Sequence, residues 1–128
     1  MTIEIPMTAA DRRRVRRLIV APDGVQFPLQ LPAGTVLQPG QILHRTADCA
    51  YAVAAAPEDV VVARPSGVAD AARLGHLIGN LHRDIEVDGD EIIALADTAL
   101  IGRLRRTAVP FTEERRAFHG RAAGEHAH

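Results

Sequence analysis

Histidine is the residue type in this sequence that points most directly to chemistry. The chain has six histidines in 128 residues, and imidazole nitrogen is a good ligand for nickel, zinc, copper and iron. They are His44, His76, His82, His119, His126 and His128. No segment has the paired Cys and His spacing of a structural zinc site. The distribution of the histidines along the chain is therefore more informative than any local motif.

His82 stands where the helical pattern of "ADAARLGHLIGNLH" ends. One histidine binds a metal weakly, but a two-fold axis beside His82 would present the same side chain twice. His126 and His128, two residues apart, form a weak chelating pair that could top such a site together with His119. The site would be open and would exchange metal readily, as a carrier requires. Its imidazole side chains would bind the metal in their neutral form, so metal binding would weaken at acid pH.

From the residues alone, capping of the helix or packing competes with metal binding as the role of His82. His44 and His76 are interpreted as ordinary surface or core residues. Hydrolytic and phosphate-binding motifs are absent, and the acidic residues of 84–91 are interpreted as a solvated hairpin. The arginine run "DRRRVRR" (11–17) is interpreted as a solvated face, because the net charge is −1 and only four residues are aromatic. We therefore expect no nucleic-acid partner.

The composition predicts a modest core made of Ala, Val, Leu and Ile. Small domains with such cores are commonly stabilised by oligomerisation, which buries apolar surface that would otherwise be exposed. The lone Cys49 is expected to be a small core residue. The N-terminal residues lack the order of a signal peptide, and no apolar run approaches the roughly 18–20 residues that span a bilayer. We expect a cytoplasmic protein without a membrane partner.

The first half of the sequence predicts strands and turns. Strands are expected at 16–20, 25–31, 50–56 and 59–64, with shorter apolar runs at 35–37 and 41–45. Pro28 indicates that the second of these is an edge strand. The spacing predicts a small N-terminal β-barrel or sandwich domain over residues 1–58.

The pattern becomes helical after "RPSG" (64–67), with Ser66 as the expected N-cap. A first helix from Val68, a hairpin over 84–95, a second helix over 96–106 and a strand over 107–111 follow. With the strand 59–64 this order is βαββαβ, which predicts a ferredoxin-like domain over 59–112, for metal binding and dimerisation. Residues 113–128 are expected to be a flexible tail, and the overall class is α+β. Gly75 and Gly79 predict close approach by a neighbouring element.

Two motifs in this order resemble the family of the urease accessory protein UreE. "GNLH" (79–82) is similar to the family's GNrH at the end of a helix, with Leu81 in place of Arg. "PFTEERRAF" (110–118) is similar to its PFePEgGAY, with Glu113 and Phe118 replacing Pro and Tyr. "DGVQFPLQLPAGTVLQPGQIL" (23–43) is similar to its β-domain, so the resemblance covers most of the chain.

The resemblance implies a homodimeric nickel metallochaperone that is not an enzyme. His82 is then the principal ligand of Ni2+, supported by Gly79 and Asn80 of the motif, with Zn2+ or Cu2+ as substitutes. The implied partners are a second copy, a urease-maturation GTPase and the apo-urease complex. "ALADTAL" (94–100) lacks the histidines that family members carry near the second helix, and the tail holds only His119, His126 and His128. The alternative is an assembly module of the same fold with weak or lost metal binding.

Overall fold

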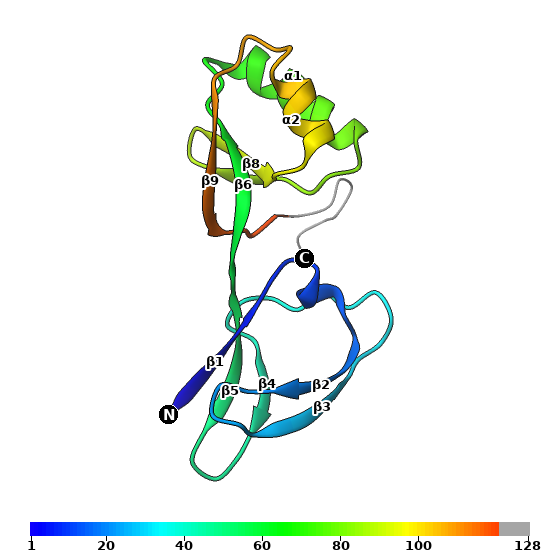
Figure 1. Ribbon diagram of the computed structural model, residues 1–128, viewed down its shortest axis with the longest axis vertical. Helices are drawn as coiled ribbons and strands as arrows, with labels where there is room; N and C mark the ends of the chain where they lie inside the picture. The colour runs from blue at the N-terminus through cyan, green and yellow to red at the C-terminus, as the bar shows by residue number, and fades with distance from the viewer. Residues whose placement is uncertain (121–128) are drawn as a thin grey trace. The chain divides into compact units, whose positions relative to one another are not determined.

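The computed structural model describes residues 1–120, which divide into two compact units. The first comprises Met1–Ala56, and the second begins at Pro57 (Figure 1). The fold is mixed α+β, as the sequence predicts. The tail histidines His126 and His128 lie outside the described residues. In the described part of the chain, no helix is long and apolar enough to cross a membrane.

Five strands and a short 3-10 helix make up the first unit. They are β1 (Thr2–Met7), η1 (Asp11–Arg13), β2 (Arg16–Val20), β3 (Gln26–Gln30), β4 (Ile42–Arg45) and β5 (Ala50–Ala55). One sheet has the order β1-β5-β4, with β1 parallel to β5, and the second is the antiparallel pair β2-β3. Neither sheet closes into a barrel, so that part of the prediction is wrong. A chain with so few strands leaves the edges of both sheets without a partner strand that could close the ring.

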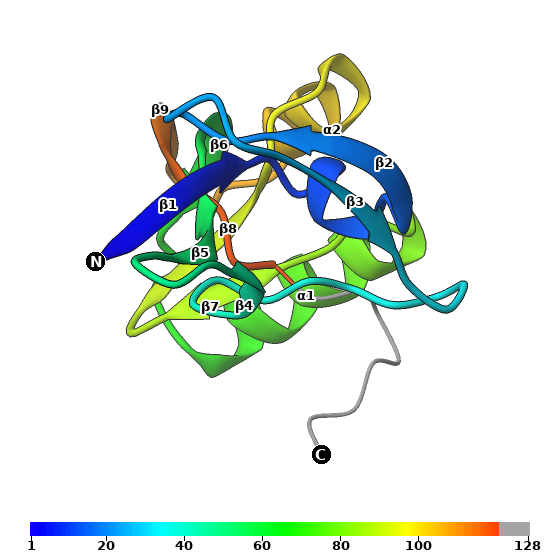
Figure 2. The ribbon, with the colours of Figure 1, turned by 90° about the horizontal axis from the view of Figure 1, so that it is seen from below.

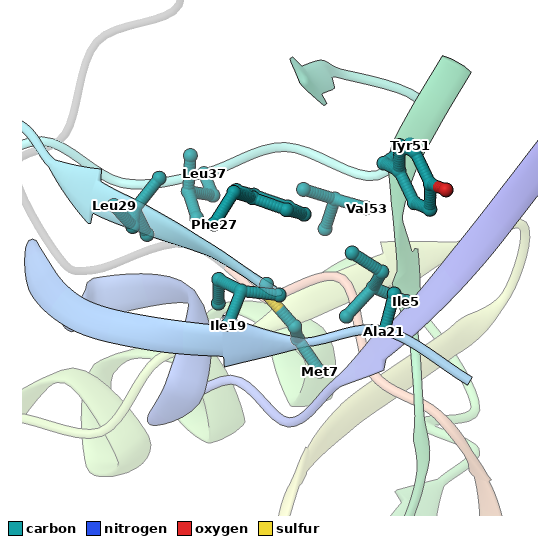
Figure 3. Packing of buried hydrophobic residues seen from close by; sticks show 9 residues of the cluster. All are labelled: Ile5, Met7, Ile19, Ala21, Phe27, Leu29, Leu37, Tyr51 and Val53. Atoms are coloured by element: carbon teal, nitrogen blue, oxygen red, sulfur yellow. The ribbon is translucent and has the colours of Figure 1, made fainter. Parts of the chain in front are cut away.

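The core of this unit comes from alternate residues of its strands. Ile5 and Met7 of β1, Phe27 and Leu29 of β3, and Val53 of β5 are all buried in one cluster (Figure 3). Successive side chains of a strand point to opposite faces of the sheet, so a sheet with one face in solvent buries every second residue. The run 35–37 is not a strand, although its Leu37 joins the cluster with 1% of its surface exposed.

Tyr51 and His44 add an aromatic group to this cluster. The buried Tyr51 hydroxyl donates a hydrogen bond of 2.6 Å to Asp23 Oδ2. This hydrogen bond, followed by burial, raises the pKa of Tyr51 to about 12. His44 stacks on Phe27 with ring centroids 4.6 Å apart, and Cys49 packs against the core.

The arginine run is not a uniformly solvated face. Arg12 is buried, with 5% of its surface exposed, and its Nη1 donates a 2.7 Å hydrogen bond to the carbonyl of Met7. The Arg12 carbonyl in turn accepts from the Leu37 amide at 2.8 Å. Arg12 thus ties the end of β1 to the long loop before β4, because a buried guanidinium needs its donors satisfied.

The second unit follows the order βαββαβ over residues 57–120. Its elements are β6 (Pro57–Ala63), α1 (Val68–Asn80), β7 (Glu86–Asp88), β8 (Glu91–Leu95), α2 (Thr98–Leu104) and β9 (Phe111–Ala117). The strands form one antiparallel sheet in the order β7-β8-β6-β9. Both helices pack on one face of it, where Leu74, Ile78, Leu100 and Leu104 meet Val61, Ala63, Ile92 and Ala94.

The last strand differs from the sequence-based expectation. β9 begins at Phe111, and residues 113–117 of the predicted flexible tail belong to it, paired along the whole of β6. Glu113 and Arg115 of the strand lie on the face that carries the helices, in register with Val61 and Asp59, while Thr112, Glu114 and Arg116 lie on the face of the sheet that carries no helix. Cross-strand ion pairs there replace the apolar contacts that usually stabilise a strand.

Those ion pairs form a closed ring of four side chains. Arg64 Nη2 lies 2.8 Å from Glu91 and 3.2 Å from Glu114. Arg116 Nη2 lies 3.1 Å from Glu91 and 3.6 Å from Glu114. The Thr112 hydroxyl donates to Glu114 at 2.6 Å, and this hydrogen bond, followed by that of Arg64, lowers the pKa of Glu114. The motif glutamate therefore holds β6, β8 and β9 in register.

Candidate metal centre

The candidate site is built on the end of α1. The helix buries Leu74 and Ile78, one turn apart, and packs Leu77 and Leu81 partly against the same core. Its N-cap is Gly67, which makes no side-chain cap, so the prediction for Ser66 is wrong. The Ser66 hydroxyl donates to Asp70 at 2.7 Å instead. The buried stripe fixes the direction in which the helix ends at Asn80.

The "GNLH" segment closes the helix with a Schellman motif. Leu81 is the C-cap residue, the His82 amide donates to the Gly79 carbonyl at 2.9 Å, and the Arg83 amide donates to the Ile78 carbonyl at 3.2 Å. These two bonds satisfy carbonyls that the end of a helix leaves unpaired. The motif requires a left-handed residue after the cap, and His82 occupies that position with φ 56°.

A left-handed histidine is an unusual choice. Glycine is the usual residue at this position, and a side chain there costs about 1–2 kcal/mol. Among the described residues, His82 is the one with positive φ that is not glycine. Strain of this kind is common at functional sites.

The imidazole of His82 is free for chemistry. His82 is exposed, which argues against packing, and the cap of the helix is made by its backbone. Within residues 1–120 its ring has no hydrogen bond or ion pair. Of the three roles weighed from the sequence, a ligand role is the one that uses the ring.

Arg83 and Asp97 hold the loop that carries His82. Arg83 Nε lies 2.9 Å from Asp97 Oδ2, while Asp97 Oδ1 accepts the amide of Leu100 at 2.9 Å and caps α2. One carboxylate therefore fixes both the start of α2 and the residue after His82. The capping role of Asp97 is readable from the sequence, but its second partner is not, because that contact depends on how the two helices pack.

The other histidines are differently placed. His76 Nε2 lies 3.2 Å from Asn80 Nδ2, one turn apart on α1, so the motif asparagine contacts a histidine of its own helix. His44 belongs to the first unit and stacks there. The exposed His119 follows β9, and its amide donates to Glu86 Oε1 at 2.9 Å. No three His, Cys, Asp or Glu side chains in the described part of the chain form a group that could hold a metal.

Comparison with known proteins identifies the family of the chain. A protein of Deinococcus radiodurans named urease accessory protein UreE is 48% identical over 124 residues, which are 97% of this chain and 80% of that protein. A protein of the same name from Synechococcus sp. is 46% identical over 126 residues, which are 98% and 85% of the two chains. The chain belongs to the UreE family. A UreE of Corynebacterium efficiens, 34% identical over 106 residues that are 82% of this chain and 69% of that protein, extends the likeness.

No family model matches the chain, so the UreE assignment rests on these relatives. Within this UreE chain the two motifs have separate physical roles. "GNLH" builds a strained helix end that exposes His82, while Glu114 of "PFTEERRAF" belongs to the ring that joins three strands. The second role has no signal in the sequence, because it depends on Arg64, which follows β6, and on Glu91 of β8.

Proposed function

We propose that this chain is a urease accessory protein that carries nickel, binding Ni2+ at His82 and passing it on for the maturation of urease. It acts as a metallochaperone and not as an enzyme, because ligand exchange is the only chemistry required. The observation that carries the proposal is the exposed imidazole of His82, held in left-handed backbone and without a partner within residues 1–120. Neutral imidazole suits Ni2+, and it also accepts Zn2+ or Cu2+.

A second copy of the chain supplies the other half of the proposed site. Gly75 and Gly79 lie two turns and one turn before His82, and a Cβ built at either would meet nothing within 4 Å. The neighbouring element expected there from the sequence is not found among the described residues, which leaves room for a partner's helix. In a two-fold dimer each copy would contribute one His82.

An unpartnered apolar groove lies along the same helix. Val68 and Val87, with 87% and 67% of their surfaces exposed, line it together with Ala71 and Gly75. Exposed apolar surface of this kind favours association. We therefore assign metal binding and dimerisation to the second unit, whose βαββαβ order and strand order β7-β8-β6-β9 support a ferredoxin-like domain.

His119, His126 and His128 are proposed as additional ligands that reach over the paired His82 side chains. The site would then be open on one side, so that nickel can leave to the next carrier. The proposed recipients are a urease-maturation GTPase and the apo-urease complex.

Nickel titration tests the proposal. Ni2+ added to the purified chain should bind as a single ion per pair of chains, and His82→Ala should abolish that binding while His76→Ala, on the same helix, retains it. Unchanged binding in His82→Ala would move the site to the tail. An absence of nickel binding in the unaltered chain would favour the assembly module.

The dimer is tested by a charge placed in the groove. Val68→Glu should lower the dimer fraction measured by light scattering without harming the fold, because an acidic residue in the first turn of a helix is favourable. Ala69→Glu is the matched control, since it adds the same charge at an exposed neighbour that does not line the groove. Equal dimer fractions in the two variants would contradict the proposed surface.

A further inference from the structure

The chain after the last strand is linked to the opposite edge of the sheet by a hydrogen bond. β9 and β7 are the two edges of the sheet, with β6 and β8 between them. The two residues after β9, Phe118 and His119, form a segment that we call the strap. Its His119 amide donates a 2.9 Å hydrogen bond to Glu86 Oε1, so the strap, which leads away from β9 beneath β6 in Figure 1 and past β8 in Figure 2, is connected to β7 through the Glu86 side chain.

The face of the sheet on which the strap lies follows from the strand register. Glu86 pairs with Ile93, and Ile93 pairs with Val62. Paired residues lie on one face, and this face is opposite to Val61 and the helices. The strap therefore lies on the side that carries the ring of ion pairs.

Two features fix the strap in one conformation. The Phe118 side chain is fully buried, with 0% of its surface exposed. Its ring occupies the space that a Cβ at residue 120 would fill, so Gly120 is the residue that fits there. The path of the chain up to Gly120 is thus determined by packing as well as by the bond to Glu86.

The strap ends at the first residue of β7, the strand that follows the loop carrying His82. β7 begins at Glu86, four residues after His82. Four residues span at most roughly 14 Å when fully extended, so the backbone of Glu86 lies no farther than that from the backbone of His82. The His119 amide can be farther from His82 only by the length of the Glu86 side chain and its hydrogen bond.

We infer that Glu86 is a positioning residue for the metal site. Its carboxylate holds the strap at the β7 edge and thereby presents His119 to nickel bound at His82. This inference rests on the proposed function. Glu86 acts through the backbone of His119 and does not itself bind the metal.

The first test measures the strap without metal. Glu86→Ala removes the acceptor of the His119 amide, so hydrogen exchange at that amide should accelerate by at least tenfold, because exchange reports local opening. Glu86→Gln keeps an acceptor oxygen and should restore most of the protection. Asp88→Ala is the matched control on the same strand, because the Asp88 carboxylate makes no hydrogen bond or ion pair within residues 1–120.

The second test measures nickel affinity in a double-mutant cycle. Glu86→Ala and His119→Ala should each weaken Ni2+ binding on the order of tenfold, the usual scale for residues that support a metal ligand. The double variant should be no weaker than either single variant, since both remove the same contribution. Glu86→Gln should bind nearly as tightly as the unaltered chain.

The outcomes separate this inference from the proposed function. An Ni2+ affinity of Glu86→Ala equal to that of Asp88→Ala, or an unchanged exchange rate at His119, overturns the role of Glu86. Additive losses in the double variant also overturn it. Retention of nickel binding by His82→Ala instead overturns the proposed function. The hydrogen-exchange rate at His119 would still decide whether Glu86 holds the strap, because that test uses no metal.

Discussion

The left-handed backbone of His82 leads to an unusual prediction, in which removing the functional residue makes the protein more stable. Glycine at position 82 would relieve a cost of about 1–2 kcal/mol for a side chain at φ 56°. Glycine has greater conformational freedom in the unfolded chain, and this offsets about 0.5–1 kcal/mol of the gain in stability. Because His82 is exposed, no packing is lost. His82→Gly should therefore raise the free energy of unfolding by about 0.5–1 kcal/mol.

The same substitution at His76 is the control, because it should act in the opposite direction. His76 is also exposed, but it lies inside α1, where glycine lowers helix stability by about 0.5 kcal/mol relative to histidine. His76→Gly should thus be less stable than the unaltered chain, and should still bind nickel.

Urea denaturation followed by circular dichroism measures both effects. The protein should be metal-free and at one concentration, because nickel and dimerisation both add to apparent stability. If His82→Gly proves less stable than the unaltered chain, the strain assigned to the left-handed histidine is wrong. If it is more stable and still binds nickel, the strain is real but the function of His82 is not.

Three further predictions concern other groups. Tyr51 is the single tyrosine, so phenolate absorbance should titrate near pH 12 in the folded chain. Asp23→Asn should move the midpoint of this titration towards pH 10. An unmoved midpoint would refute the role of the hydrogen bond between Tyr51 and Asp23. Glu114→Gln should destabilise the chain at neutral pH. Because folding lowers the pKa of Glu114, its contribution is present above the usual value of 4.5 and lost as the pH falls through the lowered one, so the two stability curves should converge in acid. Asp97→Ala should cost about 1 kcal/mol as a lost helix cap, measurable by urea denaturation. Arg83→Ala, which leaves that cap intact, should cost less.

Local signals account for much of what the sequence predicts correctly. Asp88 and Gly89 mark the hairpin of β7 and β8, and Asp97 marks the start of α2. These features depend on residues close together in the chain. The position of His82 at a helix end is equally local, but its left-handed backbone is not readable from the histidine itself.

Long-range contacts account for the errors. β1 alternates in burial, but its partner β5 lies at the other end of the unit, and Pro6 weakens the strand pattern. β9 contains few residues typical of strands, and its Glu114 and Arg116 are paired with Arg64, which follows β6, and with Glu91 of β8, contacts that the local sequence does not reveal. The buried Arg12 looks like part of a solvated run until the carbonyl of Met7 is placed beside it.

The parallel pairing of β1 with β5 determines the order in which the first unit can form. β1 is an edge strand whose partner within residues 1–120 is β5, the last strand of its own unit. Within this unit β1 is synthesised before the other strands but can pair only once β5 has been made, so its apolar Ile5 and Met7 have no partner strand while the rest of the unit is made. Completion of this unit, and not its beginning, is the step at which the nascent chain buries the apolar side chains of β1.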